Sequence, residues 1–162
     1  MNEQIQNVVN LLDEKNIKYS LVEHIPVYTI DEMLALNLPE ANVIAKNLFI
    51  RDDKKKNYYI IVIAQEKKVN LKALREKLGT RPLSFASEND MWNILELTKG
   101  SVTPLGILND ENRIVKVVMD KFFTDKNIAV HPNSNTASVW LKTEDLAKII
   151  KEHGNSMEFV DM

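Results

Sequence analysis

The sequence predicts one α/β (α+β) domain with a mixed β-sheet, extending over residues 1–162. The chain has 162 residues and is 44% hydrophobic, which suits a single core of ordinary size. Helix-type and strand-type patterns alternate along it, with no linker between them. No repeat period and no low-complexity segment is present, so collagen-like, solenoid and wholly disordered architectures are excluded.

The N-terminal region predicts two helices. Apolar side chains recur at helical spacing along residues 2–15, where they form one stripe: Ile5, Val8, Val9 and Leu12. Thr29 and Glu32 have the spacing of a capping box, which predicts a short helix from Ile30 toward Leu36. Both helices are expected to pack an apolar side against the rest of the domain.

The next region predicts an antiparallel hairpin. The runs Val43–Ile50 and Tyr58–Ala64 are strand-like, and the polar stretch Asp52–Asn57 joins them. The second run is apolar at every position, which is typical of a strand in the middle of a sheet.

The remaining elements alternate in type. Asn70 is placed to cap a helix that Gly79 ends, and a second helix is expected after Ser87. Thr143 is expected to cap a last helix, which ends before Gly154. Three further strands are predicted: Ile114–Asp120, Ile128–His131 and Ala137–Leu141.

Positive charge is concentrated in one part of the chain. The formal net charge is -2, yet the segment from Arg51 to Arg81 has ten Lys or Arg residues against four acids. The rest of the chain has eleven bases and nineteen acids. This basic flank either attracts a polyanion or is a solvated surface rich in lysine, and charge alone leaves both interpretations open.

The sequence lacks the features of several protein classes. It has no cysteine, and its three histidines do not have the spacing of metal ligands, so we expect no metal and no cofactor. No Walker loop, dinucleotide-binding glycine loop or nucleophile elbow occurs. The start of the chain does not resemble a signal peptide, and no apolar run is long enough for a membrane span. We therefore expect a cytoplasmic protein with no membrane partner.

Four local features are candidates for chemistry. Lys46 interrupts an apolar strand, so it either points into a cleft or extends from a sheet edge into solvent. Arg81 precedes a short strand and could grip a phosphate, although exposed loop arginines are common. The segment Gly100–Pro104 is either a backbone platform for a ligand or an ordinary connector. The segment His131–Thr136 is either the rim of a site or an Asn-rich turn.

Six short motifs follow one another along nearly the whole chain: His24-x-Pro26-Val27-Tyr28-Thr29, Ala45-Lys46-Asn47-Leu48-Phe49, Leu83-Ser84-Phe85-Ala86-Ser87, Gly100-Ser101-Val102-Thr103-Pro104, Leu108-Asn109-Asp110 and His131-Pro132-x-x-Asn135-Thr136-Ala137. Each motif is short, whereas the ordered set is specific. Together they resemble the stand-alone bacterial prolyl-tRNA editing proteins, which are related to the YbaK family and to the insertion domain of bacterial prolyl-tRNA synthetase.

This resemblance implies a largely antiparallel, barrel-like sheet surrounded by helices. It also implies an aminoacyl-tRNA deacylase that acts in trans on proline tRNA carrying the wrong amino acid, with alanine favoured. The implied partner is the acceptor end of that tRNA, and prolyl-tRNA synthetase is a candidate second partner. The ribose hydroxyl next to the ester is expected to help activate the water, which explains why no Ser-His-Asp set is needed.

The resemblance also assigns residues to the site. Lys46, Gly100 and His131 are expected at the catalytic centre, with Lys46 the side chain on which activity depends most and His131 an orienting group. The remaining assignments are to substrate binding: Ile30 and Met33 in the amino-acid pocket, Asn47 and Arg81 at the tRNA terminus, and Ser101, Val102, Thr103 and Pro104 in the loop beside the ester.

Two other functions stay open at this point. The same residues would serve a non-catalytic protein that binds tRNA ends or amino acids. Alternatively, the reaction is the same but the amino acid on the tRNA is cysteine or serine. An intact Lys46 and an intact Gly100–Pro104 loop favour an enzyme, because a protein that only binds would be free to lose them.

Overall fold

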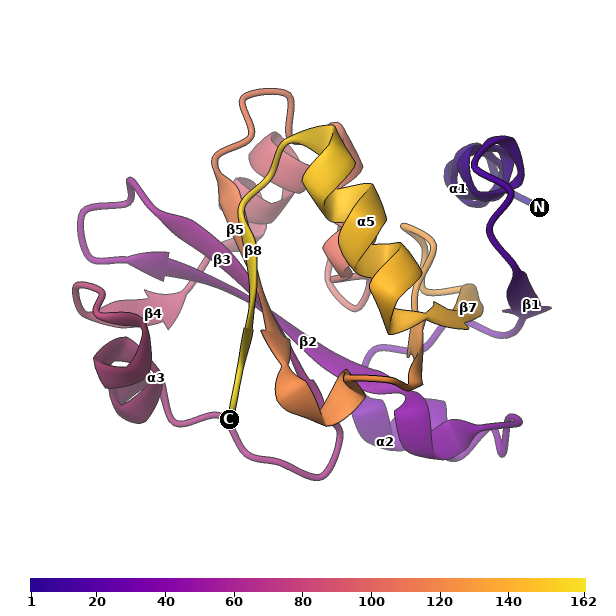
Figure 1. Cartoon of the computed structure of the whole chain (residues 1–162), viewed down its shortest axis with the longest axis horizontal. Helices are drawn as coiled ribbons and strands as arrows, with labels where there is room; N and C mark the ends of the chain where they lie inside the picture. Colours follow the sequence, from indigo (N-terminus) through magenta and orange to yellow (C-terminus); the bar gives the residue numbers. More distant parts are fainter.

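Two β-sheets form the framework of the protein (Figure 1). The computed structural model describes all of residues 1–162. The five-stranded sheet has the order β4 (Leu83–Phe85), β2 (Ala45–Asp52), β3 (Tyr58–Ala64), β5 (Val115–Asp120) and β8 (Met157–Val160). The three-stranded sheet has the order β1 (Tyr19–Glu23), β7 (Ala137–Lys142) and β6 (Asn127–Val130).

The pairing of the strands is mixed and largely antiparallel, as predicted. β5 runs parallel to β3 and to β8, and every other neighbouring pair is antiparallel. A parallel bridge between Ile44 and Ala129 joins the two sheets just before β2. The sheets therefore meet at one edge, but no continuous ladder closes them into a barrel, so the barrel-like expectation is corrected to an open arrangement.

The predicted β2–β3 hairpin is present. β3 has the predicted bounds, whereas β2 begins and ends two residues later than expected, with Ala45 paired to Ala64. β3 is buried at every position and lies in the middle of its sheet. Its alternate residues face opposite sides, so that Ile60 joins the main core and Ile61 joins a second apolar cluster.

Helices cover both faces of this sheet. α5 (Thr143–His153) and α1 (Glu3–Glu14) pack apolar side chains into the main core. α3 (Leu71–Leu78) packs Leu74 into the cluster on the opposite face. Figure 1 shows α5 lying across the sheet, well separated from α3. None of the helices has the length and apolar character that crossing a membrane requires.

The other helices are short. α2 (Ile30–Leu34) and α4 (Glu88–Asp90) are single turns, and α4 continues as the π-helical turn Met91–Leu95. Three 3₁₀ turns complete the chain: Ala41–Val43, Pro104–Asn109 and Lys121–Phe123. Polar side chains accept hydrogen bonds from the first N–H groups of α1, α2, α3 and α4, which explains where these helices begin: Asn2, Thr29, Asn70 and Ser87.

Several details differ from the predictions. Thr143 is the first residue of α5 and not its cap, which is Lys142, and the Thr143 hydroxyl is buried without a hydrogen-bond partner. The helix after Ser87 is shorter than expected because it changes to π geometry, and α2 ends at Leu34. β1 and β8 were not predicted, because short edge strands depend on the neighbour with which they pair more than on a pattern of their own.

Candidate functional site

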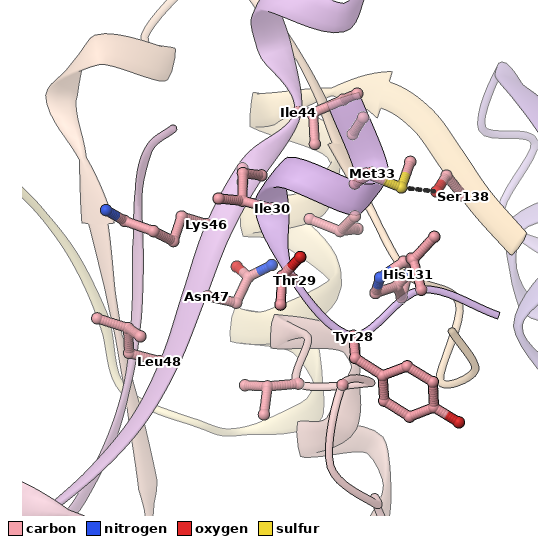
Figure 2. Close-up of a pocket in the computed structure, with 16 residues that line it drawn as sticks. Tyr28, Thr29, Ile30, Met33, Ile44, Lys46, Asn47, Leu48, His131 and Ser138 are labelled. Atoms are coloured by element: carbon pink, nitrogen blue, oxygen red, sulfur yellow. Dashed lines mark hydrogen bonds between the residues drawn. The ribbon is translucent and has the colours of Figure 1, made fainter. Parts of the chain in front are cut away.

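A cavity of about 260 Å³ opens where the segment leading into α2, the start of β2, the Gly100 loop and the end of β6 meet (Figure 2). Elements far apart in the sequence therefore converge on one place. Most of the sequence-predicted site residues line this cavity: Ile30, Met33, Lys46, Asn47, Gly100, Val102 and His131. No group of three or more His, Asp or Glu side chains is arranged to hold a metal ion.

The start of β2 presents an unpaired backbone edge to the cavity. β4 pairs with β2 only from Ile50 onward. The main-chain oxygen of Phe49 accepts a hydrogen bond from Ala86 on this edge. Because the backbone groups of alternate residues point to the same edge of a strand, the N–H and C=O of Asn47 also point to it. β2 therefore offers a ligand both a donor and an acceptor.

Lys46 and Asn47 lie on opposite sides of β2 (Figure 2). Asn47 points toward Thr29, and its side-chain oxygen is buried without a hydrogen-bond partner. A buried acceptor without a partner costs about 1–3 kcal/mol, so this oxygen is ready for a donor from a ligand. The Lys46 ammonium donates to the main-chain oxygen of Lys67, which does not line the cavity. Lys46 thus borders the cavity while its charged end is held outside it.

Gly100 occupies a position that no other residue would fit without strain. Its φ is +87°, a conformation that L side chains rarely adopt. A β-carbon there would lie 2.8 Å from Cδ1 of Tyr28 and 3.1 Å from the main-chain oxygen of Val27. The loop therefore packs directly on the segment that leads into α2.

The rest of the Gly100–Pro104 loop is held by hydrogen bonds from its hydroxyl side chains to neighbouring residues. The Ser101 hydroxyl donates within the turn, at 2.6 Å, and the Thr103 hydroxyl donates to the main-chain oxygen of His131 at 2.7 Å. Beside the glycine, Val102 lines the cavity. Three loop residues that were expected to bind substrate are buried and do not line it: Ser101, Thr103 and Pro104. They support the loop from behind.

His131 borders the cavity as a neutral imidazole. Its Nδ1 donates to the main-chain oxygen of Ala137 at 2.7 Å, which leaves Nε2 as an unprotonated acceptor. Burial lowers the pKa of His131 below its ordinary value of 6.5, and the neighbouring His24 lowers it further, whereas the bond to Ala137 raises it. At neutral pH His131 is therefore uncharged and able to accept a hydrogen bond.

Residues 24–149 match the sequence model of a known family, described as the aminoacyl-tRNA editing domain. This range includes every residue that lines the cavity. The chain belongs to this editing domain family. It is an aminoacyl-tRNA hydrolase. The family and the enzyme class that the ordered motifs predicted are therefore confirmed.

Individual relatives are similar to this editing domain protein over nearly the whole length of its chain. It is 46% identical to the prolyl-tRNA editing protein ProX of Acetoanaerobium sticklandii over 158 residues, which are 97% of this chain and 96% of the relative. It is 34% identical over 144 residues to prolyl-tRNA synthetase associated domain-containing protein 1 of Mus musculus, covering 86% of this chain and 85% of the relative. A solved structure proposed to be a trans-editing enzyme for prolyl-tRNA synthetase has the same fold, with a TM-score of 0.74 at 17% identity, covering 99% of this chain and 97% of that one.

The editing domain also has a polar network that the sequence analysis missed. Ser138 is buried in β7 and lines the cavity. Its Oγ lies 2.9 Å from Nε2 of His24. It also lies 3.7 Å from the sulfur of Met33 (Figure 2). A hydroxyl has one proton, so Ser138 donates to only one of these atoms at a time. The available signal was a polar residue inside the apolar strand Ala137–Leu141.

The motif that follows His131 has a structural role in the editing domain. The Asn135 side chain donates to the main-chain oxygen of Val27 at 2.8 Å, and the Asn135 main-chain oxygen accepts from the Val27 N–H at 3.3 Å. This pair of bonds fixes the segment against which Gly100 packs. Three motifs that are separate in the sequence thus hold one another in place around the cavity.

Arg81 does not line the cavity of the editing domain. Its guanidinium pairs with Asp53, in the turn between β2 and β3, through contacts of 2.6 and 3.0 Å. The hydrogen bond from Arg81 holds the pKa of Asp53 below its ordinary value. The structure therefore places Arg81 at the other end of β2 from the cavity. It lies beside the basic hairpin turn, the β2–β3 turn that carries Lys54, Lys55 and Lys56.

Proposed function

We propose that the chain, acting as one domain over residues 1–162, removes alanine from mischarged proline tRNA. A relative that is named a prolyl-tRNA editing protein supports this tRNA. The proposal rests chiefly on one observation, the convergence of Lys46, Gly100 and His131 on a cavity that Ile30 and Met33 narrow with apolar side chains. The domain acts in trans on the acceptor end of the tRNA, and prolyl-tRNA synthetase is its candidate second partner.

The protein needs to supply little chemical activation, because an aminoacyl ester is already reactive. The oxygen of a water molecule attacks the ester carbonyl carbon. The bond from that carbon to the ribose oxygen breaks, and a proton from the water passes to the ribose oxygen. The products are the free amino acid and a tRNA with its terminal hydroxyl restored. The site therefore needs to fix the tRNA end, polarise the carbonyl and admit one water.

Each group on the cavity wall has a role in this reaction. Lys46 contacts the terminal phosphate and ribose, where an ammonium is a suitable partner. The backbone at Gly100 faces the aminoacyl group. The unpaired oxygen of Asn47 and Nε2 of His131 accept hydrogen bonds from the ribose hydroxyl, the substrate ammonium or the water. The ribose hydroxyl beside the ester helps to activate the water.

Deacylation assays on proline tRNA charged with alanine, cysteine, serine or proline test the proposal. We expect alanyl-tRNA to be cleaved fastest and prolyl-tRNA to stay intact. Faster cleavage of the cysteinyl or seryl ester would change the amino acid but keep the reaction. Binding of the tRNA without cleavage of any ester above the uncatalysed rate would instead indicate a protein that only binds tRNA ends.

Met33 is expected to restrict the size of the amino acid. It is 4% exposed and lines the cavity, so Met33→Ala enlarges the space on the amino-acid side. A methylene or so changes discrimination in an apolar pocket by about 1–3 kcal/mol, so we expect relative cleavage of larger esters to rise by about tenfold or more. The measurement is kcat/KM for each ester. The same substitution at Met157, a β8 residue outside the cavity, is the control, and an unchanged substrate profile in Met33→Ala would remove Met33 from the pocket.

The neutral state of His131 predicts the acid side of the pH profile. Because its pKa lies below 6.5, Nε2 stays an acceptor until the pH falls below that value. We expect kcat/KM to keep its value down to pH 6.5 and to fall only below it, and His131→Asn to remove this acid limb. The same titration affects stability. Because the pKa of His131 is lower in the folded chain than in the unfolded chain, the free energy of unfolding is expected to fall as the pH drops below 6.5. An acid limb centred above pH 6.5, or one that His131→Asn leaves in place, would contradict this role.

The basic hairpin turn is expected to contact phosphates of the acceptor stem. Lys54 and Lys56 are exposed there, about 20 Å from Asn47 along β2 at ~3.3 Å per residue, which suits a stem whose end enters the cavity. Replacing both with Glu should weaken tRNA binding at low salt and reduce the salt dependence of Kd. Lys151→Glu on α5 is the control for charge. Identical affinity of the double variant and the parent at low salt would exclude this surface.

A further inference from the structure

We infer that Lys67 is a positioning residue for Lys46, and this inference depends on the role proposed for Lys46. The main-chain oxygen of Lys67 accepts the hydrogen bond of the Lys46 ammonium. The Lys67 side chain donates hydrogen bonds to Asp120 and to the main-chain oxygen of Met162. One residue thus links the charged end of Lys46 to the interior of the protein. Neither the Lys67 side chain nor its anchors line the cavity.

The turn that presents this oxygen begins at the end of β3. Ala64, the last residue of β3, pairs with Ala45, the residue before Lys46. The N–H of Lys67 donates to the main-chain oxygen of Ala64 at 3.0 Å, which closes the turn. The turn therefore brings Lys67 back beside the strand that carries Lys46.

Asp120 anchors this turn from the interior. Its carboxylate is 0% exposed and accepts from the Lys67 ammonium at 3.0 Å and from the N–H of Ala64 at 3.0 Å. The N–H of Phe122 donates to it as well, at 3.0 Å. A buried carboxylate requires a charged partner and a full set of hydrogen bonds, and Lys67 supplies the charge. The Lys67 ammonium also donates to the main-chain oxygen of Met162 at 2.6 Å.

Gln65 anchors the same turn from the side of the cavity. Its side-chain amide donates to the main-chain oxygens of Ala41, at 2.6 Å, and Ile44, at 3.3 Å. Ile44 lines the cavity and precedes β2. The Lys67 oxygen is thus fixed between two anchors, Asp120 on one side and the segment before β2 on the other.

The consequence for catalysis is a restricted Lys46 side chain. A lysine has a long flexible stem, and an ammonium free to rotate would spend little time where the tRNA end needs it. Holding the ammonium on one carbonyl outside the cavity limits its positions before substrate arrives. Lys46 then moves to the substrate from one fixed starting point.

The test compares Lys67→Met, which removes the anchor, with Lys67→Arg, which keeps a charged donor for Asp120. Steady-state deacylation is the first readout. We expect Lys67→Met to lower kcat by about tenfold, since misplacement by an ångström can cost ~100-fold, while KM changes by less than about twofold. Lys67→Arg should restore most of the loss. Glu66→Gln, an exposed neighbour in the same turn without a hydrogen bond, is the control and should match the parent.

The second readout is the reactivity of the Lys46 amine toward an acylating reagent, measured by mass spectrometry without tRNA. Lys46 should be modified faster in Lys67→Met than in the parent, in Lys67→Arg or in Glu66→Gln. A folded Lys67→Met with a lower melting temperature but unchanged kcat and unchanged Lys46 labelling would overturn the inference, because Lys67 would then be merely structural.

Two further outcomes are distinguishable. If Lys67→Met does not fold, Gln65→Leu loosens the other anchor of the same turn and is expected to give the same rise in labelling and fall in kcat. Parent-like behaviour of that variant would then overturn the inference. If the parent protein cleaves no ester, the proposed function fails, whereas the labelling of Lys46 still reports whether Lys67 positions it.

Discussion

Lys46→Ala is expected to lower kcat/KM for deacylation by about 100-fold or more, which is the loss typical of removing one preorganised group that acts on the reacting centre. Lys46 is the only lysine among the residues that line the cavity, and no arginine lines it. No other cation on the cavity wall can therefore take its place at the tRNA terminus. The measurement is single-turnover and steady-state cleavage of alanyl-tRNA, with the fold checked by thermal denaturation.

The control for charge is Lys151→Ala, since Lys151 is exposed on α5 and does not line the cavity. It removes one positive charge without touching the site, so its kcat/KM should stay within about twofold of the parent. Equal activity of the Lys46 and Lys151 variants would show that Lys46 has no part in the reaction. A loss in both would indicate that overall charge, and not the position of the ammonium, controls cleavage.

The hairpin that carries the site could be predicted from the sequence because burial imposes a pattern on a strand. β3 is buried on both faces, so its sequence is apolar at each position and is easily recognised. Lys46 stands out for the same reason, as a charge inside an apolar run. The order of the short motifs then indicated the family, although each motif alone is too short to do so.

The contacts of the site could not be predicted, because they join residues that no local pattern connects. His24 and Ser138 are 114 positions apart, and Arg81 and Asp53 are 28 apart. The pattern marked Arg81 as a phosphate-binding candidate but carried no information on the acid that pairs with it. The motif around Gly100 was recognised as a unit, yet only coordinates could separate the two residues that line the cavity from those that support them.

Gly100→Ala is expected to reduce deacylation about as much as Lys46→Ala does, although it changes only the geometry of the site. The new β-carbon would meet Cδ1 of Tyr28 at 2.8 Å, the main-chain oxygen of Val27 at 3.1 Å and Cα of Tyr28 at 3.2 Å. Two of these atoms belong to the backbone, which cannot rotate away, so the segment before α2 or the loop itself must move. A displacement of about an ångström beside the ester lowers kcat by ~100-fold.

Gly79→Ala separates this effect from the backbone strain that both substitutions share. Gly79 ends α3 with a φ of +65°, and a β-carbon there meets nothing within 4 Å. Its replacement costs about 1–2 kcal/mol of left-handed backbone strain and should lower the melting temperature without lowering kcat, because α3 does not line the cavity. Gly100→Ala should lose stability by at least as much and lose kcat in addition. If both alanine variants cleave alanyl-tRNA at the parental rate, the close contact between the Gly100 loop and the Val27–Tyr28 segment does not shape the site, and the catalytic assignment of Gly100 is wrong.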